Sequence, residues 1–473
     1  MKTLKILTIV LLSISPLILG QSKVISLDNA IQTALKSNRQ IQIAKLNVEK
    51  SQAAVSEAFG YALPSVDVSA NFSRFLEKPK LAFPDFRAIT KNSTYDVLFD
   101  EKILSRDDSK FLPVKSILQT FAQTNNYQAD LKVTQILFNS AIFRGIGASE
   151  IYLNLSKEQL KGEISKTVLN VKKAFYGALL ARDLYKISVS RYLNANEHLK
   201  NINALKDQGL VSVFDQMQAQ VQVENIRPVL QQMKNFFKDA KNGLKILLNI
   251  KQSVKLQLKG ELSYKKELLP NEGKIIERAV QSNFDLKNLK IKNQLDEEFA
   301  AIDRGDYWPT IKAFGNYSFA GNSNNFDFRN FHSATIGVTF SINLFQGNRT
   351  KHKVQQDEII RLQTKEQIST LRDATISQAK SKLNDLKRVQ SQIDAMNRNI
   401  SVAARAYQIA NDRYKQGIGS ELEIKDANLA LSQAKINYSN AVHDYLIAKA
   451  ELENLLGNVN EKYIAVYSSY LEK

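Results

Sequence analysis

Four segments of the chain alternate apolar and polar residues with a period of two, the pattern of a strand with one apolar and one polar face. The clearest is 333–344, where Ile336, Val338 and Phe340 lie on one face and Thr335 and Thr339 on the other. Each segment runs for about 10–12 residues, the length of a tilted strand that crosses a lipid bilayer. The predicted strands are about 65–75, 128–138, 310–320 and 333–344.

Aromatic residues near the strand ends favour a membrane setting, because aromatic side chains gather at the two interfaces of a bilayer. They are Phe59, Tyr61, Phe138, Tyr307, Trp308 and Phe345. A half-buried sheet in a soluble protein has the same period, but the other segments carry little apolar surface suited to covering one. We therefore expect the apolar face to contact lipid.

Four strands are too few for a closed barrel, which needs about eight. An open sheet edge in lipid would leave backbone groups unpaired, so several copies must join. Two, three or four copies would give 8, 12 or 16 strands, and the pattern alone does not choose among them. The first two strands are joined by 76–127, a long loop that is the larger candidate for an outward-facing surface feature.

The rest of the chain has the heptad spacing of long coiled-coil helices. In 141–207, for example, Ile164, Val168, Val171 and Phe175 step by four and three. A continuous helix of that length would be roughly 100 Å long. The predicted helices are 141–207 and 349–416, return helices at about 213–248 and 421–456, and helices before the strands at about 27–60 and 272–305. The remaining segments, about 249–270 and 457–473, are expected to form a belt at mid-height.

The second half of the chain repeats the first, which indicates one supersecondary unit used twice. Aligning 30–73 with 275–318 places Ser37-Asn38 on Ser282-Asn283 and Pro64 on Pro309. The predicted domains are a first structural repeat at 21–250 and a second at 251–473.

Residues 1–20 are predicted to be a cleaved signal peptide. Lys2 and Lys5 precede an apolar stretch, and Gly20 stands before a plausible cleavage site. A single membrane anchor is the competing interpretation, but the apolar run is short and is interrupted by Pro16.

Composition and motifs argue against an enzyme. The chain has no cysteine, which excludes thiol catalysis and thiolate metal sites, and its four histidines are scattered. We find no phosphate-binding loop, zinc-protease motif or nucleophile elbow, and we predict no catalytic residue, metal site or cofactor. The formal charge of +18 comes from Lys and Arg interleaved with Asp and Glu, which favours solvated helix surfaces over nucleic-acid binding.

Two related turns follow the long helices, at 205–220 and 414–429. Gly209 and Gly417 suit the left-handed position after a helix C-terminus. Ser212 and Ser420 begin the next helices, and an acid stands three residues on, so the spacing predicts a capping box with Glu423 and a close variant with Asp215.

Capping alone accounts for Asp215 and Glu423, but Asp426 lies beyond the cap, three residues after Glu423 on the same helix face. Repeated in a ring of subunits, this pair would form an acidic collar that favours cations.

Taken together, these features resemble TolC-like outer-membrane efflux proteins over nearly all of the mature sequence. The resemblance rests on the duplicated halves, the Pro64 and Pro309 junctions, and four short motifs. These are SLDNAIQTALKSNRQIQIAK (26–45), LFNS (137–140), LFQG (344–347) and YKQGIGSELEIKDA (414–427).

The resemblance implies a mainly α protein whose helices form a periplasmic tunnel and whose four strands contribute to a 12-stranded barrel in a homotrimer. It implies an outer-membrane location, contact with outer-membrane lipid, and a helical part in the periplasm. The implied partners are a periplasmic adaptor (membrane fusion) protein and an inner-membrane pump or ABC secretion transporter. The family's entrance acids fall on Glu423 and Asp426, its first-copy acid on Asp215, and a tyrosine of its gating network on Tyr414.

Adaptor contacts are expected at the turns, at Gly209, Leu210, Gly417 and Ile418. In this family a basic residue often stands two places after the second-copy turn glycine. Here that place is Gly419, which puts a salt-bridge latch at this point in doubt.

The predicted function is passive conduction of substrates to the exterior by the outer-membrane component of a tripartite efflux or type I secretion system. The alternative is a periplasmic coiled-coil scaffold or adaptor protein without a barrel. Drugs, metals and secreted proteins all stay open as cargo.

Overall fold

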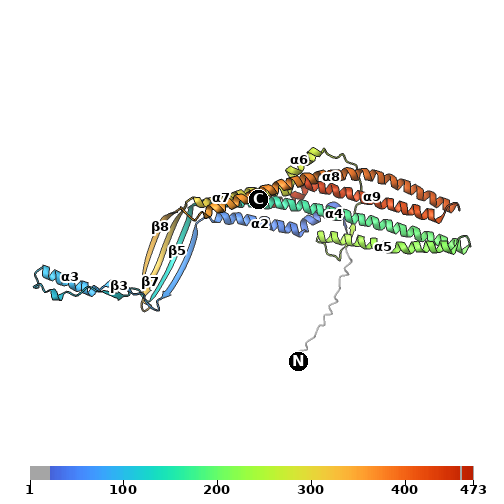
Figure 1. The fold of residues 1–473 in the computed structure, drawn as a ribbon. Coiled ribbons are helices and arrows are strands. Elements are labelled where there is room, and N and C mark those ends of the chain that lie inside the picture. The colour runs from blue at the N-terminus through green and yellow to red at the C-terminus, as the bar shows by residue number, and fades with distance from the viewer. Residues whose placement is uncertain (1–21, 459–460, 472–473) are drawn as a thin grey trace, which may run out of the picture. The chain divides into compact units, whose positions relative to one another are not determined.

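The computed structural model describes residues 22–458 and 461–471, so the predicted signal peptide lies outside the described residues. These residues form two compact units (Figure 1). The helical unit contains the described residues up to Val55, then Ala148–Glu298, then those from Gln356 onward. The strand unit contains Ser56–Gly147 and Phe299–Gln355.

The long helices predicted from the heptads are present and uninterrupted. Helix α4 spans Ser140–Asp207 and α8 spans Arg349–Lys415. The return helices α5 and α9 span Val213–Leu247 and Glu421–Leu455 and have 35 residues each. At 1.5 Å per residue, α4 and α8 are each about 100 Å long and the return helices about half that.

The helices before the strands are each broken once, whereas the sequence predicted one continuous helix per repeat. Helices α1 (Leu27–Ser37) and α2 (Arg39–Gly60) part at Asn38, and α6 (Glu272–Ser282) and α7 (Phe284–Arg304) part at Asn283. Each Asn has a non-helical backbone, and its side-chain oxygen accepts from amides of the following helix. Both asparagines therefore end one helix and cap the next.

Each of the two sets of helices in the helical unit has an apolar core of its own. The first joins α1, α2, α4 and the end of α5, and includes Leu35, Phe175 and Leu244. The second joins α6, α8 and α9, and includes Leu383 and Tyr445. The predicted α4 seam lies in the first core, with Ile164, Val168, Val171, Phe175 and Ala178 all buried.

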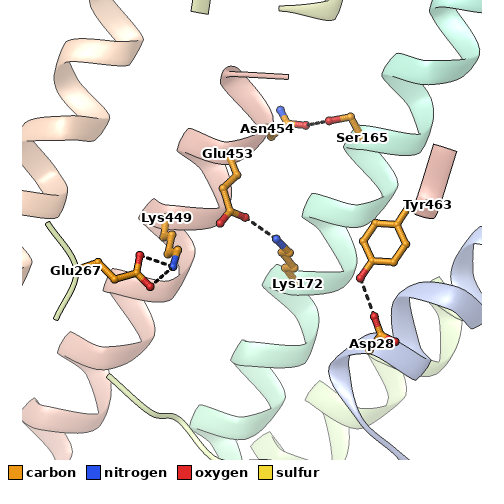
Figure 2. Close-up of polar contacts among 8 residues, drawn as sticks. All are labelled: Asp28, Ser165, Lys172, Glu267, Lys449, Glu453, Asn454 and Tyr463. Atoms are coloured by element: carbon orange, nitrogen blue, oxygen red, sulfur yellow. Dashed lines mark hydrogen bonds and ion pairs between the residues drawn. The ribbon is translucent and has the colours of Figure 1, made fainter. Parts of the chain in front are cut away.

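Polar contacts join elements far apart in sequence within the helical unit (Figure 2). Lys172 of α4 donates to Glu453 of α9 at 2.6 Å, and Lys449 of α9 donates to both oxygens of Glu267 at 2.7 Å. Tyr463, in α10 (Glu461–Ala465), donates to Asp28 of α1 at 2.8 Å.

Short elements complete this region. Strands β1 (Ser22–Ile25) and β6 (Lys255–Leu258) pair in parallel, and α11 spans Ser468–Leu471. Burial raises the pKa of Tyr467, which follows α10, to about 12, and its hydroxyl donates to the carbonyl of Leu35.

The strand unit contains the four strands that alternation predicted, with shifted ends. They are β2 (Ser65–Arg74), β5 (Asn125–Phe138), β7 (Thr310–Ser323) and β8 (Arg329–Ser341), in the order β2-β5-β7-β8, and every neighbouring pair is antiparallel (Figure 1). Strands β5, β7 and β8 extend farther from the helix junctions than predicted, because the ladder continues until Asn322 faces Arg329. The 3₁₀ turn η2 (Gly305–Tyr307) leads into β7.

One face of this sheet is apolar and uncovered in the single chain. Register places Val68 opposite Leu131, and Ala313 opposite Val338. Val68 is 77% exposed and Ile336, the neighbour of Val338 on that face, is 89% exposed. The outer edges of β2 and β8 have no partner strand among the described residues. None of the described helices combines the length and apolar character needed to cross a membrane.

The connection between β2 and β5, predicted to be a long loop, contains regular structure. Strands β3 (Leu81–Pro84) and β4 (Ser116–Gln119) pair antiparallel. Between them lie α3 (Phe86–Asp100) and the short 3₁₀ turn η1 (Asp108–Lys110). Asp85 caps α3 by accepting from the amides of Arg87 and Ala88.

Candidate functional site

The turns after α4 and α8 share one backbone geometry. Gly209 and Gly417 both have φ of +75°, in the left-handed region that favours glycine. The amides that follow reach back to the helix ends, Leu210 to the Leu205 carbonyl at 2.9 Å and Ile418 to the Arg413 carbonyl at 3.1 Å. These are the bonds of a Schellman motif, which satisfies the last carbonyls of a helix. Leu210 and Ile418 therefore protrude at the tips, 68% and 65% exposed.

The first turn closes on itself. The amide of Asp215 donates to Ser212 Oγ at 3.1 Å, and Ser212 donates from its amide to Asp215 Oδ2 at 3.0 Å. Both bonds of the capping box are thus present. Hydrogen bonds from the Ser212 side chain and then its backbone lower the pKa of Asp215. The Asp215 carboxylate is engaged within its own cap.

The second turn makes only one of the two capping-box bonds. The sequence predicted the complete box in the second turn and a variant in the first, and this prediction was wrong. The amide of Glu423 donates to Ser420 Oγ at 3.3 Å, but the Glu423 carboxylate lies 3.6 Å from Arg413 Nε. The longer Glu side chain reaches across the turn to the end of α8 instead of back to its own cap. Arg413 also donates to the Ile418 carbonyl at 3.3 Å.

Gly419 has a steric reason to lack a side chain. A Cβ atom at this position would lie 2.9 Å from the backbone nitrogen of Tyr414. The turn therefore packs tightly where a basic residue was expected. Arg413, one residue before Tyr414, supplies a cation to the turn instead.

The first turn joins α4 and α5 into one helical hairpin, and the second joins α8 and α9 into another. A cluster of polar and aromatic side chains connects these two hairpins beside the turns. His198 of α4 lies with Nε2 3.2 Å from Glu421 Oε1 of α9, an ion pair when His198 is protonated. The ring of His198 meets Tyr414 of α8 edge-on at 5.6 Å. His198 and Glu421 side chains are only 17% and 13% exposed. Burial, then the charges of Glu421 and Asp215, raise the pKa of Tyr414, which keeps its hydroxyl protonated.

A groove of about 560 Å³ separates α5 from α9 close to the turns. Its apolar lining includes Phe214, Met217, Val221, Leu422 and Leu429. The two hairpins therefore contact each other near their tips through the His198 cluster, while the return helices stand apart.

The structure brings some of the predicted site residues together and separates others. Tyr414 has a raised pKa because of burial and the charge of Glu421, and the charge of Asp215 adds to these. Glu423 and Asp426 are exposed on one helix, and Glu423 is paired with Arg413. Sequence reasoning missed Arg413, Glu421 and His198. Sequence gave no signal for the His198–Glu421 contact, because the two residues belong to different repeats.

Comparisons with known proteins agree with the fold. The family model described as outer membrane efflux protein matches residues 275–458. "Outer membrane protein TolC" of Salmonella enteritidis is 21% identical over 422 residues, 85% of each chain. The "alkaline protease secretion protein AprF" of Pseudomonas aeruginosa is 20% identical over 341 residues, 71% of each chain. The crystal structure of the CmeC outer membrane channel of Campylobacter jejuni superposes with a TM-score of 0.71 at 17% identity, covering 94% of this chain and 89% of that one.

The predicted resemblance to TolC-like outer membrane efflux proteins is therefore confirmed, by the family model over residues 275–458 and by the TolC relatives over most of the chain. The predicted family and fold class are thereby confirmed: a mainly helical tunnel protein with a β portion. Proteins of this family are transporters, so the prediction that the chain is not an enzyme is also confirmed. The roles of the individual turn residues and the boundary between repeats at residue 250 remain predictions.

Proposed function

We propose that this protein is the outer-membrane channel of a tripartite efflux or type I secretion system and passively conducts substrates to the exterior. The observation that carries the proposal is the four-stranded sheet with an exposed apolar face and two open edges. Such a sheet is stable in lipid only when its edges are paired. The alternative, a periplasmic scaffold without a barrel, leaves that apolar face without a purpose.

Three copies complete the sheet. The free edge of β2 in one copy pairs with the free edge of β8 in the next, and twelve strands close into a barrel with no unpaired edge. The polar face, with Lys132, Asn316 and Thr335 in register, then lines a wet lumen. The helices extend this path into the periplasm, where an adaptor protein links the channel to an inner-membrane pump or ABC secretion transporter.

Assembly has a direct test. The protein extracted from outer membranes in detergent is expected to run as a trimer and to form ion-conducting pores in planar lipid bilayers. A water-soluble monomer that needs no detergent would overturn the proposal. Cargo is expected to follow the partner transporter, which co-purification under cross-linking would identify.

The turns form the entrance gate in this proposal. Each turn ends a helical hairpin, and the two hairpins meet beside the turns through His198 and Glu421, while a groove lies between α5 and α9. Opening therefore requires loss of the contact between His198 and Glu421 and outward movement of the return helices. The protruding Leu210 and Ile418, each beside its turn glycine, are the proposed adaptor contacts.

The acids of the second turn set the charge preference of the entrance. Glu423 is partly compensated by Arg413 at 3.6 Å, so the exposed Asp426 supplies much of the free negative charge of the collar. The double variant Glu423→Gln, Asp426→Asn is expected to reduce the cation-to-anion permeability ratio in single-channel recordings. A control that removes two charges elsewhere, Glu224→Gln with Asp444→Asn, should leave the ratio unchanged. Equal ratios in the wild type and the collar variant would contradict the collar and leave Glu423 a capping residue only.

A further inference from the structure

Residues 76–124, called here the inserted module, form a folded unit between β2 and β5. Its ends meet, because the amide of Phe75 donates to the Thr124 carbonyl at 2.8 Å. The Asn92 side chain of α3 bonds to both the amide and the carbonyl of Leu112, at 2.7 and 2.8 Å. The rings of Phe99 and Phe111 pack edge-on with centroids 6.0 Å apart. The module therefore has a defined structure and is more than a flexible loop.

The base of the module is fixed to the turn between β7 and β8. Asn324 Oδ1 accepts from the Thr124 amide and hydroxyl, both at 3.0 Å, and from Lys78 Nζ at 2.6 Å. Arg74 lies over the ring of Phe326, 5.8 Å from its centroid. These contacts hold the module at the end of the sheet where β2 ends and β5 begins.

The module buries far too little apolar surface for its size. Among its hydrophobic residues only Ala88 and Phe99 are buried. Seven large apolar side chains are at least half exposed: Leu76, Leu81, Val97, Ile103, Val114, Leu118 and Phe121. A two-stranded ribbon and one helix of this length are marginal without a larger core. Another surface is needed to cover these side chains.

The place where the module joins the sheet indicates which surface covers its apolar side chains. The module grows from β2, an edge strand of the sheet, so it stands at the seam where a second copy pairs with β2 in the proposed barrel. The neighbouring copy brings its own β8 edge and its β7–β8 turn to this seam, including Phe326 and Phe331, which are 58% and 54% exposed.

We propose that the inserted module is an intersubunit clasp, whose exposed apolar residues pack on the neighbouring copy at the outer rim of the barrel. The inference rests on the proposed function, because it needs the assembled barrel. Lipid headgroups fit the surface less well. The module carries eight basic and seven acidic side chains, so it has almost no net charge with which to bind anionic lipid.

Photocrosslinking of the purified detergent-solubilised protein tests the clasp. A benzoyl-phenylalanine at Leu118 or at Val97 is expected to give covalent dimers on illumination. Mass spectrometry should map the link to residues 76–124 or 324–341 of another copy. The same samples dissociated in hot SDS before illumination should give none. Trimers whose links are all within one chain would overturn the clasp and leave the proposed channel standing, whereas a monomeric sample would overturn both.

Two variants measure what the clasp contributes. Leu118→Asp is expected to lower the dissociation temperature of the trimer by about 5 °C, whereas Ser105→Asp, which adds the same charge at an exposed polar position, should not. Replacing 76–124 by a two-residue turn is expected to keep trimers and pores but lower the dissociation temperature at least as much. An unchanged temperature in both Leu118→Asp and the deletion would contradict the clasp.

Discussion

The two helical turns have the same backbone but different side-chain chemistry. Gly209 and Gly417 have the same φ, and both turns make the same bonds back to the preceding helix. The first turn then engages its acid in its own capping box, whereas the second turns Glu423 toward Arg413. The difference of one methylene between Asp and Glu, with a cation in reach, is enough to redirect the carboxylate.

This difference shows how a duplicated unit can acquire unequal roles without changing its fold. The first turn is self-contained, and its acid is satisfied whatever its neighbours do. In the second turn, Glu423 forms an exposed ion pair with Arg413. The helix that begins there, α9, also contributes Glu421 to the contact with His198. The second turn is therefore the one whose state depends on the rest of the protein.

The largest effect is expected from substituting the turn glycines, which test whether the two turns have equivalent backbones. Valine at either turn glycine would be forced into the left-handed region, which costs about 2 kcal/mol for an L-residue. We expect Gly209→Val and Gly417→Val to lower the protection of amides in the adjoining helix ends by similar factors in hydrogen exchange. Gly177→Val, at a helical glycine with open space around it, is the control. A large effect in only one turn would show that the two backbones are not equivalent.

The next largest effect is expected from the contact between His198 and Glu421, which joins the two hairpins. Glu421→Gln removes a largely buried charge facing His198, and we expect it to weaken the coupling between hairpins by about 1 kcal/mol. Because the hydrogen-bond alignment of His198 Nε2 is poor, the effect should stay at this modest level. The measurement is the fraction of time that single channels spend in the high-conductance state, which should rise. Glu224→Gln, exposed on α5, is the control.

Much of the fold was predictable, because the alternation of strands and the heptad spacing of helices depend only on residues close together in the sequence. Alternation placed Val68 and Ile336 on an apolar face that the structure leaves exposed, and heptads placed Ile164 and Phe175 in a buried seam. The helix breaks at Asn38 and Asn283 were missed, because apolar spacing continues past both residues. The helix α3 within 76–127 was also missed, although Asp85 before it is a typical N-cap residue.

In the candidate site too, features that depend on neighbouring residues could be predicted from the sequence, and features that depend on tertiary packing could not. The turn glycines and capping serines could be predicted, since each acts within a few residues of itself. The destination of the Glu423 carboxylate could not, because it depends on which cation the folded turn brings near. The contact between His198 and Glu421 depends on the packing of two repeats and has no local signature.

The self-contained cap of the first turn should be sensitive to acid. The pKa of Asp215 is lowered by Ser212, so the folded state holds fewer protons on this group than the unfolded chain. Its contribution is fully present above the ordinary aspartate pKa of about 3.9 and is lost as pH falls through the lowered value. Hydrogen exchange in the first turn of α5 should therefore lose protection at the acid end of a titration. Asp215→Asn should already lack that protection at neutral pH and show no further acid loss.

The smallest expected effect concerns the ion pair of the second turn. Arg413 and Glu423 are about half exposed and 3.6 Å apart, so solvent screens the attraction and side-chain ordering offsets it. A double-mutant cycle with Arg413→Gln and Glu423→Gln should give a coupling energy of at most about 0.5 kcal/mol, which falls further in 1 M salt. A coupling well above 1 kcal/mol that persists in salt would mean that the pair is shielded from water in the assembled channel. The second turn would then be latched as firmly as the first is capped, and the inequality between the two copies would vanish.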